Sequence, residues 1–243
     1  MGADQNFDWR HAAASAIDWW REAGVDATID EAPRNWLARV EPAPVEAISE
    51  VAAPFVLPDT LDAFNTWRSG SDAPEAGWPE QMIPAQGAAS SNLMVLVDLP
   101  EREDAAAATL MSGPVGRLFD RMLAAIGRDR ASIYLAAVCT ARPGSGRISP
   151  EIEERLNELV RHHVALAAPK RVLLLGNAPS RALLGADAAR ARGGLRTLNL
   201  KVGTVETEIE AVASFHPRFL LEKPAFKAEA WKDLQMLIGG LDS

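Results

Sequence analysis

The sequence predicts an α/β protein, a three-layer α/β/α sandwich around a central, mainly parallel four-stranded sheet, preceded by a helical N-terminal extension. The first observation is that short apolar runs alternate with stretches of helical periodicity after residue 91, which favours parallel strands joined by helices. The second is that runs such as Leu93–Val97 are apolar at every position, as expected for strands covered on both faces.

The first 90 residues form an acidic, Trp-rich extension and linker. The apolar spacing over Trp9–Ala23 predicts a helix that ends before Gly24, and a second short helix is expected over Val45–Val51. A third begins after Asp59 or Thr60, either of which can cap it. The stretch of residues 69–92 is rich in Gly, Pro, Ala and Ser and is expected to be a loop.

Charge separates this extension from the rest of the chain. Residues 1–90 hold 15 acidic and 5 basic residues, whereas residues 91–243 hold 18 acidic and 20 basic, close to neutrality. The acidic region also carries six of the seven Trp, so we expect it to pack on something, and a protein partner could bind there. A near-neutral second part, residues 91–243, suits a domain that touches a short stretch of phosphate backbone.

The second part supplies the sheet and its helices. Strands are expected at Leu93–Val97, Ile133–Val138, Arg171–Leu175 and Glu206–Phe215, with further strand at Thr197–Leu200. Helices are expected from Gly113 to Ile126, from the Ser149–Pro150 cap to about Ala167, from Asn177 or Ser180 to Leu184, and from Ala225 to Ile238. Right-handed crossovers bring the strand-to-helix loops to one edge of the sheet, where an open α/β fold binds its ligands.

Composition excludes several classes of protein and site. No uncharged apolar run reaches the length of a membrane span, and the N-terminus has no features of a secretion signal, so a cytoplasmic protein is expected. The lone Cys139 permits neither an internal disulfide nor a cysteine-rich cluster. No His spacing suits a metal, so no metal or other cofactor is expected.

Three segments, taken in their order along the chain, resemble those of a known family. His216-Pro217-Arg218-Phe219-Leu220-Leu221 follows the last strand, Leu173-Leu-Leu-Gly-Asn177 spans the third, and Ala141-Arg142-Pro143 follows the second. In this order they resemble the iron–sulfur-containing branch of the uracil-DNA glycosylase superfamily, over about residues 93–237. The resemblance implies the family's fold and an enzyme that flips a nucleotide into a pocket to release uracil.

The resemblance also implies roles for particular residues. His216 lies at the motif histidine that donates to the leaving base, and Asp98 lies at the motif carboxylate that orients water. The remaining implied substrate contacts are Leu99, Pro100, Met111, Ala137, Asn177 and Pro217. The implied DNA contacts are Arg218, Leu221, Lys223 and Lys227.

The sequence departs from the family at several of these positions. The motif Gly-Glu-Ala-Pro-Gly is here Val97-Asp98-Leu99-Pro100-Glu101. Met111 stands where the family stacks an aromatic on uracil, and Ala137 stands where it reads the base with Asn. Of the family's four cluster cysteines, the first pair has no counterpart before Leu93, the third aligns at or next to Ala141, and the fourth aligns near Leu156. We expect the N-terminal segment or a tighter loop to hold these elements in place of a cluster.

Two functions therefore remain open. The chain is either a glycosylase that acts on uracil or another damaged base through Asp98 and His216, or a catalytically inactive member that binds nucleic acid, a nucleotide or a protein at the same edge. A different hydrolase on this fold is a third, weaker reading.

Overall fold

The computed structural model describes residues 9–22, 57–144 and 148–241, and the chain divides into two compact units, Met1–Phe55 and Val56–Ser243. In the first unit, helix α1 spans Trp9–Glu22 and exposes Ile17, Trp19 and Trp20. The helix expected over Val45–Val51 lies outside the described residues. None of the described helices has the length and apolar character needed to cross a bilayer.

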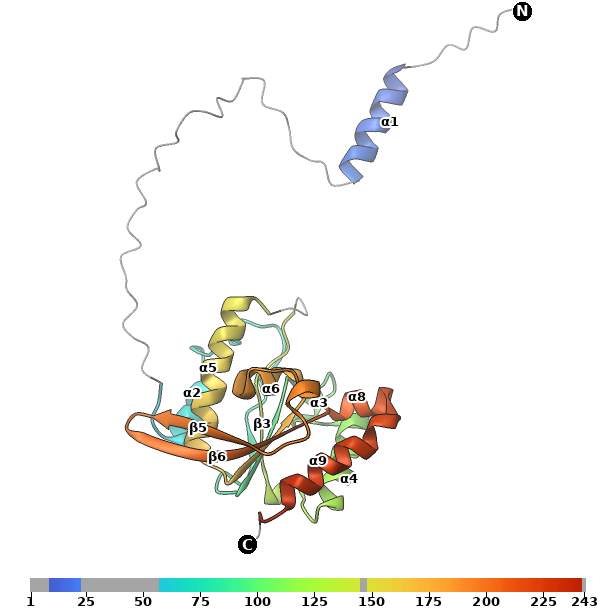
Figure 1. Cartoon of the computed structure of the whole chain (residues 1–243). Coiled ribbons are helices and arrows are strands. Elements are labelled where there is room, and N and C mark those ends of the chain that lie inside the picture. Colours follow the sequence, from blue (N-terminus) through green and yellow to red (C-terminus); the bar gives the residue numbers. More distant parts are fainter. Residues whose placement is uncertain (1–8, 23–56, 145–147, 242–243) are drawn as a thin grey trace, which may run out of the picture. The chain divides into compact units, whose positions relative to one another are not determined.

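The second unit is built on a six-stranded sheet in the order β1-β3-β2-β4-β6-β5 (Figure 1). The strands are β1 Gln86–Gly87, β2 Leu93–Val97, β3 Tyr134–Ala137, β4 Arg171–Leu175, β5 Arg196–Val202 and β6 Val205–Ser214. The four middle strands are parallel, as the sequence predicts. An antiparallel strand at each edge, β1 and β5, enlarges the sheet beyond the four strands expected.

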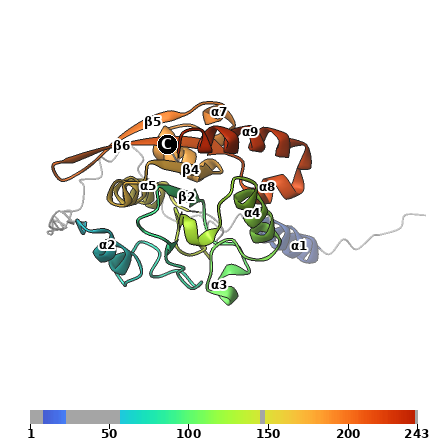
Figure 2. The same cartoon turned by 90° about the horizontal axis from the view of Figure 1, so that it is seen from below.

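Helices cover both faces of this sheet (Figure 2). The helices of the unit are α2 Leu61–Arg68, α3 Asp104–Ala107, α4 Gly113–Ala125, α5 Pro150–Ala167, α6 Asn177–Leu184, α7 Ala188–Ala191, α8 Pro217–Glu222 and α9 Lys227–Ile238. Short 3₁₀ turns lie at η1 Arg130–Ser132 and η2 Pro224–Phe226. The sequence does not predict α3, α7 and α8, because each of them has only four to six residues.

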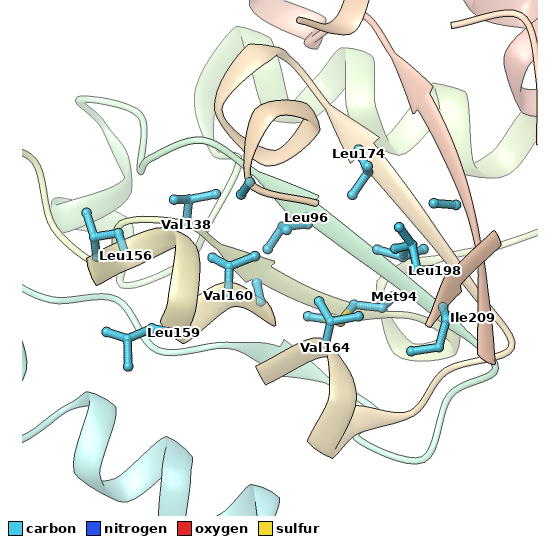
Figure 3. Close-up of a cluster of buried hydrophobic side chains, with 14 of the residues drawn as sticks. Met94, Leu96, Val138, Leu156, Leu159, Val160, Val164, Leu174, Leu198 and Ile209 are labelled. Atoms are coloured by element: carbon cyan, nitrogen blue, oxygen red, sulfur yellow. The ribbon is translucent and has the colours of Figure 1, made fainter. Parts of the chain in front are cut away.

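Alternation along the strands creates two hydrophobic cores. Met94 and Leu96 of β2 pack with Leu156 and Val164 of α5 on one face, as the side chains of Figure 3 show. Their neighbours Leu93, Val95 and Val97 enter a second core with α4 and α9. Burying each large apolar side chain contributes about 1.5–3 kcal/mol. The three-layer sandwich therefore follows from strands that are apolar at every position.

Helix caps agree with the sequence. The Thr60 hydroxyl accepts from the Ala63 amide at 3.4 Å and begins α2, and Ser149 accepts from Ile152 to begin α5 with Pro150 in its first position. Each cap satisfies a backbone donor that the first helical turn leaves without a partner.

The segment between α2 and β2 belongs to the second unit, although the sequence suggested a boundary at residue 90. Glu75 is fully buried and forms a two-contact ion pair with Arg68, with one contact at 2.5 Å. Arg68 also donates to the Val138 carbonyl, and Glu75 accepts from the Thr140 amide, both at 2.9 Å. This ion pair fastens residues 68–75 to the end of β3.

Replacing Glu75 with Gln should destabilise the fold by about 3–5 kcal/mol, because the Arg68 guanidinium would stay buried without its counter-charge. Urea unfolding followed by Trp fluorescence measures the change. The control is Glu206→Gln, which removes an exposed ion pair with Lys201 on the β5–β6 hairpin and should leave the midpoint unchanged. Equal midpoints for the two variants would show that the buried pair contributes little.

Candidate active site

The carboxyl ends of the four parallel strands meet at one edge of the sheet, and two of the predicted residues meet there. Asp98 directly follows β2, and His216 follows β6. The His216 Nε2 atom lies 3.5 Å from the Asp98 Oδ1 atom. In the sheet, β3 lies on one side of β2, whereas β4 and then β6 lie on the other. The order of the strands therefore reverses between β2 and β4, and open α/β folds bind ligands at such a point.

Local structure determines how His216 is held. It is the N-cap of α8, and its Nδ1 atom accepts a hydrogen bond from the Arg218 amide at 3.2 Å. A neutral imidazole with an accepting Nδ1 carries its proton on Nε2. That Nε2 atom is buried and has no hydrogen-bond partner among the described residues. His216 therefore presents an unused N–H donor beside Asp98.

Burial keeps this ring neutral. The side chain is only 7% exposed, and desolvation lowers the pKa of His216 below its ordinary value. The nearby Asp98 carboxylate opposes this by raising the pKa, whereas the Arg218 guanidinium lowers it. A neutral donor can stabilise negative charge on a departing group without itself needing to be protonated further.

Arg218 joins this pair to the loop that follows β2. Its Nε and Nη2 atoms donate to the two Glu101 carboxylate oxygens at 3.1 and 2.7 Å, and its Nη1 atom lies 3.5 Å from Asp98 Oδ2. Glu101 is the residue that replaces the second motif glycine, and it is buried. Arg218, expected to contact DNA, is thus held by two carboxylates of the site.

Asp104 fixes the same loop from inside. Its carboxylate is fully buried and accepts from the backbone amides of Glu101, Met111 and Ser112 at 2.7, 2.9 and 2.6 Å, and from the Ser112 hydroxyl. Arg142 donates to the Pro100 carbonyl at 2.6 Å. These bonds hold the loop that carries Asp98 in one conformation.

A cavity of about 590 Å³ opens beside Asp98 and His216. Leu99 and Asn177, both predicted substrate contacts, line it with them. The Asn177 Oδ1 atom accepts from the Ala188 amide at 3.0 Å, which orients its amide group. Four of the predicted site residues therefore share one cavity.

Other predicted contacts lie elsewhere. Met111 and Ala137 do not line the cavity: both belong to the hydrophobic core under α4, and Met111 is 1% exposed. Pro100 is buried in the loop after β2, and Pro217 is the buried first residue of α8. Met111 and Ala137, at which the resemblance implies stacking on uracil and reading of its edge, thus contribute to packing.

Sequence reasoning missed several cavity residues. Phe215 and Phe219 flank His216 with the four-residue spacing that brings side chains to one side of a helix start, which was a usable signal. Glu153 and Asn157 of α5 also line the cavity, as does Arg181 of α6. Nothing in their local sequence shows that α5 and α6 border the site, since this depends on the packing of the two helices.

The expected DNA-contact residues lie at the surface next to the site. Leu221 is 41% exposed, and Lys223 and Lys227 are exposed with it. A groove of about 510 Å³ passes this region and includes Leu221, Glu222, Arg102 and Arg142. The groove carries both signs of charge.

The residues at the expected cluster positions do not fit an iron–sulfur cluster. Ala141 and Leu156 are buried and apolar, and no group of three or more metal-binding side chains lies among the described residues. The single Cys139 is buried, which raises its pKa to about 12, with the Glu75 charge adding to the effect. A protonated thiol is a poor metal ligand.

Comparison with known proteins supplies the context. The model of the uracil DNA glycosylase superfamily matches residues 84–235, more than half of the chain. A type-4 uracil-DNA glycosylase of Pyrobaculum aerophilum is 26% identical over 162 residues, covering 65% of this chain and 82% of that protein. A type-4 uracil-DNA glycosylase of Archaeoglobus fulgidus is 22% identical over 165 residues, covering 64% and 79%.

His216 should titrate with a midpoint below 6.5, because its buried ring resists the proton. Asp98→Asn should lower the midpoint further by removing a negative charge, whereas Arg218→Gln should raise it by removing a positive one. Long-range ¹H–¹⁵N NMR spectra report the midpoint and the protonated nitrogen, and His216→Gln assigns the signal. A midpoint above 6.5, or a proton on Nδ1 at neutral pH, would contradict this geometry.

Proposed function

Because the chain belongs to the uracil-DNA glycosylase superfamily, we propose that it hydrolyses the N-glycosidic bond of uracil or another damaged base in DNA, with Asp98 and His216 as the reacting pair. The observation that carries this proposal is that the two side chains line one cavity with 3.5 Å between their polar atoms. Such a cavity can receive a nucleotide that has left the base stack.

In the proposed reaction, the bond between C1′ of the sugar and the base nitrogen breaks, and its electron pair leaves with the base. The Asp98 carboxylate orients a water molecule toward C1′ and accepts the proton that the water loses as its oxygen bonds to carbon. The Nε2–H group of His216 donates a hydrogen bond to the departing base, whose negative charge it stabilises. Arg218 keeps Asp98 in position, because the same guanidinium is held by the Glu101 carboxylate.

The base need not be uracil. Ala137 has no side-chain amide, and it lies in the hydrophobic core. A site that lacks a dedicated hydrogen bond to its ligand loses much of its power to reject related ligands. The proposed substrate class is therefore a damaged base that fits the cavity of about 590 Å³, with uracil as one member.

A catalytically inactive member that binds nucleic acid, a nucleotide or a protein is the second candidate. The observation that favours it is that Met111 and Ala137, which align with the family's uracil contacts, are packed away from the cavity. In both cases Leu221, Lys223 and Lys227 are the proposed contacts to the DNA strand. The exposed Trp19 and Trp20 of α1 support a protein partner for the N-terminal unit, and a cytoplasmic location is proposed.

Base release from oligonucleotides containing uracil, hypoxanthine or xanthine tests the proposed reaction. His216→Ala and Asp98→Asn should each reduce the rate of release about 100-fold or more, because each removes a group that acts on the transition state. His162→Asn is the matched control, since His162 lies on α5, bonded to the Pro58 carbonyl and outside the cavity.

The substrates are to be presented in single- and double-stranded form. Release that persists in both variants would remove Asp98 and His216 from the reaction. No release from any substrate by the wild-type protein, together with measurable DNA binding, would contradict the hydrolase and favour the binding module.

A further inference from the structure

We infer that the Phe219 ring, supported by Phe215, forms the surface on which this cavity stacks a nucleobase, purine as well as pyrimidine, and that the Asn157 amide contacts the edge of that base. The inference rests on the proposed function, because it concerns the ligand of the same cavity. It moves base recognition from the loop after β2, where Met111 lies, to the start of α8.

The two rings stack on each other, so Phe215 supports Phe219. Their centroids are 5.0 Å apart with planes 28° from parallel, and Phe226 packs against both at 5.2 Å. Phe215 and Phe219 line the cavity and are only partly buried, whereas Phe226 does not line it. Because the Arg192 guanidinium also lies over Phe215, the ring that remains to offer a base flat apolar contact is Phe219, which the Nζ atom of the exposed Lys223 approaches at 5.5 Å.

Arg192 holds the Phe215 ring, and with it the pair of stacked rings, in place. Its guanidinium lies 4.0 Å from the centroid of the Phe215 ring, and its Nε and Nη1 atoms donate to Asp233 and Glu229, both at 2.7 Å. Asp233 is buried and also accepts from the Ser214 hydroxyl. A ring fixed before binding loses little conformational freedom when a ligand stacks on it.

A polar contact is available in the same cavity. Asn157 lines it from α5, and its side chain has no hydrogen bond to another described residue. Its amide offers both a donor and an acceptor, which matches the mixed edge of a base. Met111 cannot take the stacking role, because it is 1% exposed and packs in the core that Val97 and Phe119 share.

The volume of the cavity sets the size of the ligand. About 590 Å³ lies within the range of sites that enclose whole small-molecule ligands, so a purine fits as well as a pyrimidine. Because stacking depends on ring area and not on the pattern of edge groups, hypoxanthine and xanthine should bind at least as well as uracil.

The test measures binding in the Asp98→Asn background, so that hydrolysis does not consume the probe. Fluorescence anisotropy gives the affinity for single-stranded oligonucleotides that carry hypoxanthine, uracil or a tetrahydrofuran abasic analogue at one position. The affinity ratio of base to abasic strand isolates the contribution of the base from that of the phosphates. Phe219→Leu should reduce this ratio about tenfold, and Asn157→Ala should change the relative preference among bases.

Trp231→Leu is the matched control, since Trp231 is an exposed aromatic of α9 that does not line the cavity, and its replacement should leave the ratio within about twofold. Phe215→Leu provides a second cavity variant if Phe219→Leu fails to fold, as judged by circular dichroism. An unchanged ratio in a folded Phe219→Leu or Phe215→Leu variant overturns the inference, as does a base-to-abasic ratio of one before any further substitution.

Failure of the inference and failure of the proposed function give different results. A base-dependent affinity that needs Phe219, with no base release by the wild-type protein, supports the stacking surface and contradicts the hydrolase. Base release that Phe219→Leu leaves unchanged supports the hydrolase and contradicts the stacking surface.

Discussion

The ion pair between Arg68 and Glu75 is the constraint on which the end of β3 depends. Burying two charges costs several kcal/mol, and it is tolerated when the charges pair closely and bond to further groups. Here the further groups are the Val138 carbonyl and the Thr140 amide, which belong to the backbone on either side of Cys139. Because Val138 and Cys139 line the cavity, a contact made by the segment after α2 shapes the candidate site.

The same ion pair lies near positions at which the resemblance implies cysteine ligands of a cluster. The resemblance implies two of those ligands beside Ala141 and Leu156, on the loop after β3 and on α5. In this chain α2 packs against α5 through Phe64, which is fully buried, while Glu75 reaches Thr140 next to Ala141. Packing connects α2 to α5, and the hydrogen bond to Glu75 connects the segment after α2 to the loop after β3.

Features that depend on neighbouring residues could be predicted from the sequence, whereas features that depend on contacts between distant residues could not. The four parallel strands were predictable, because β2, β3 and β4 are short apolar runs and β6 ends in one, at Ala211–Ala213. Strand β1 was not, since two residues paired through their backbone leave no periodic signal. The loop expected around residue 75 is a loop, but the sequence does not show that Glu75 is buried in it, since Glu75 accepts from the Thr140 amide 65 positions away.

The site shows the same division. Asp98 and His216, expected at strand ends, line one cavity, whereas Met111 and Ala137, expected as contacts from the resemblance, lie in the core. A side chain at the end of a strand can face either the edge or a core, and only the conformation of the following loop decides. Met111 has a left-handed backbone with φ 57°, and Asp104 and Arg130 hold its amide and carbonyl groups. That arrangement involves residues spread over almost 30 positions.

The bond from the Arg218 amide to His216 Nδ1 makes one nitrogen serve two purposes. It begins a six-residue helix, and it decides which side of the ring can carry a proton. A proton that arrives at Nδ1 competes directly with the first turn of α8. Acid would therefore loosen the helix that carries Phe219 and Arg218 at the same time as it charged the imidazole. The protonation state of His216 and the stability of α8 would then change over the same pH range.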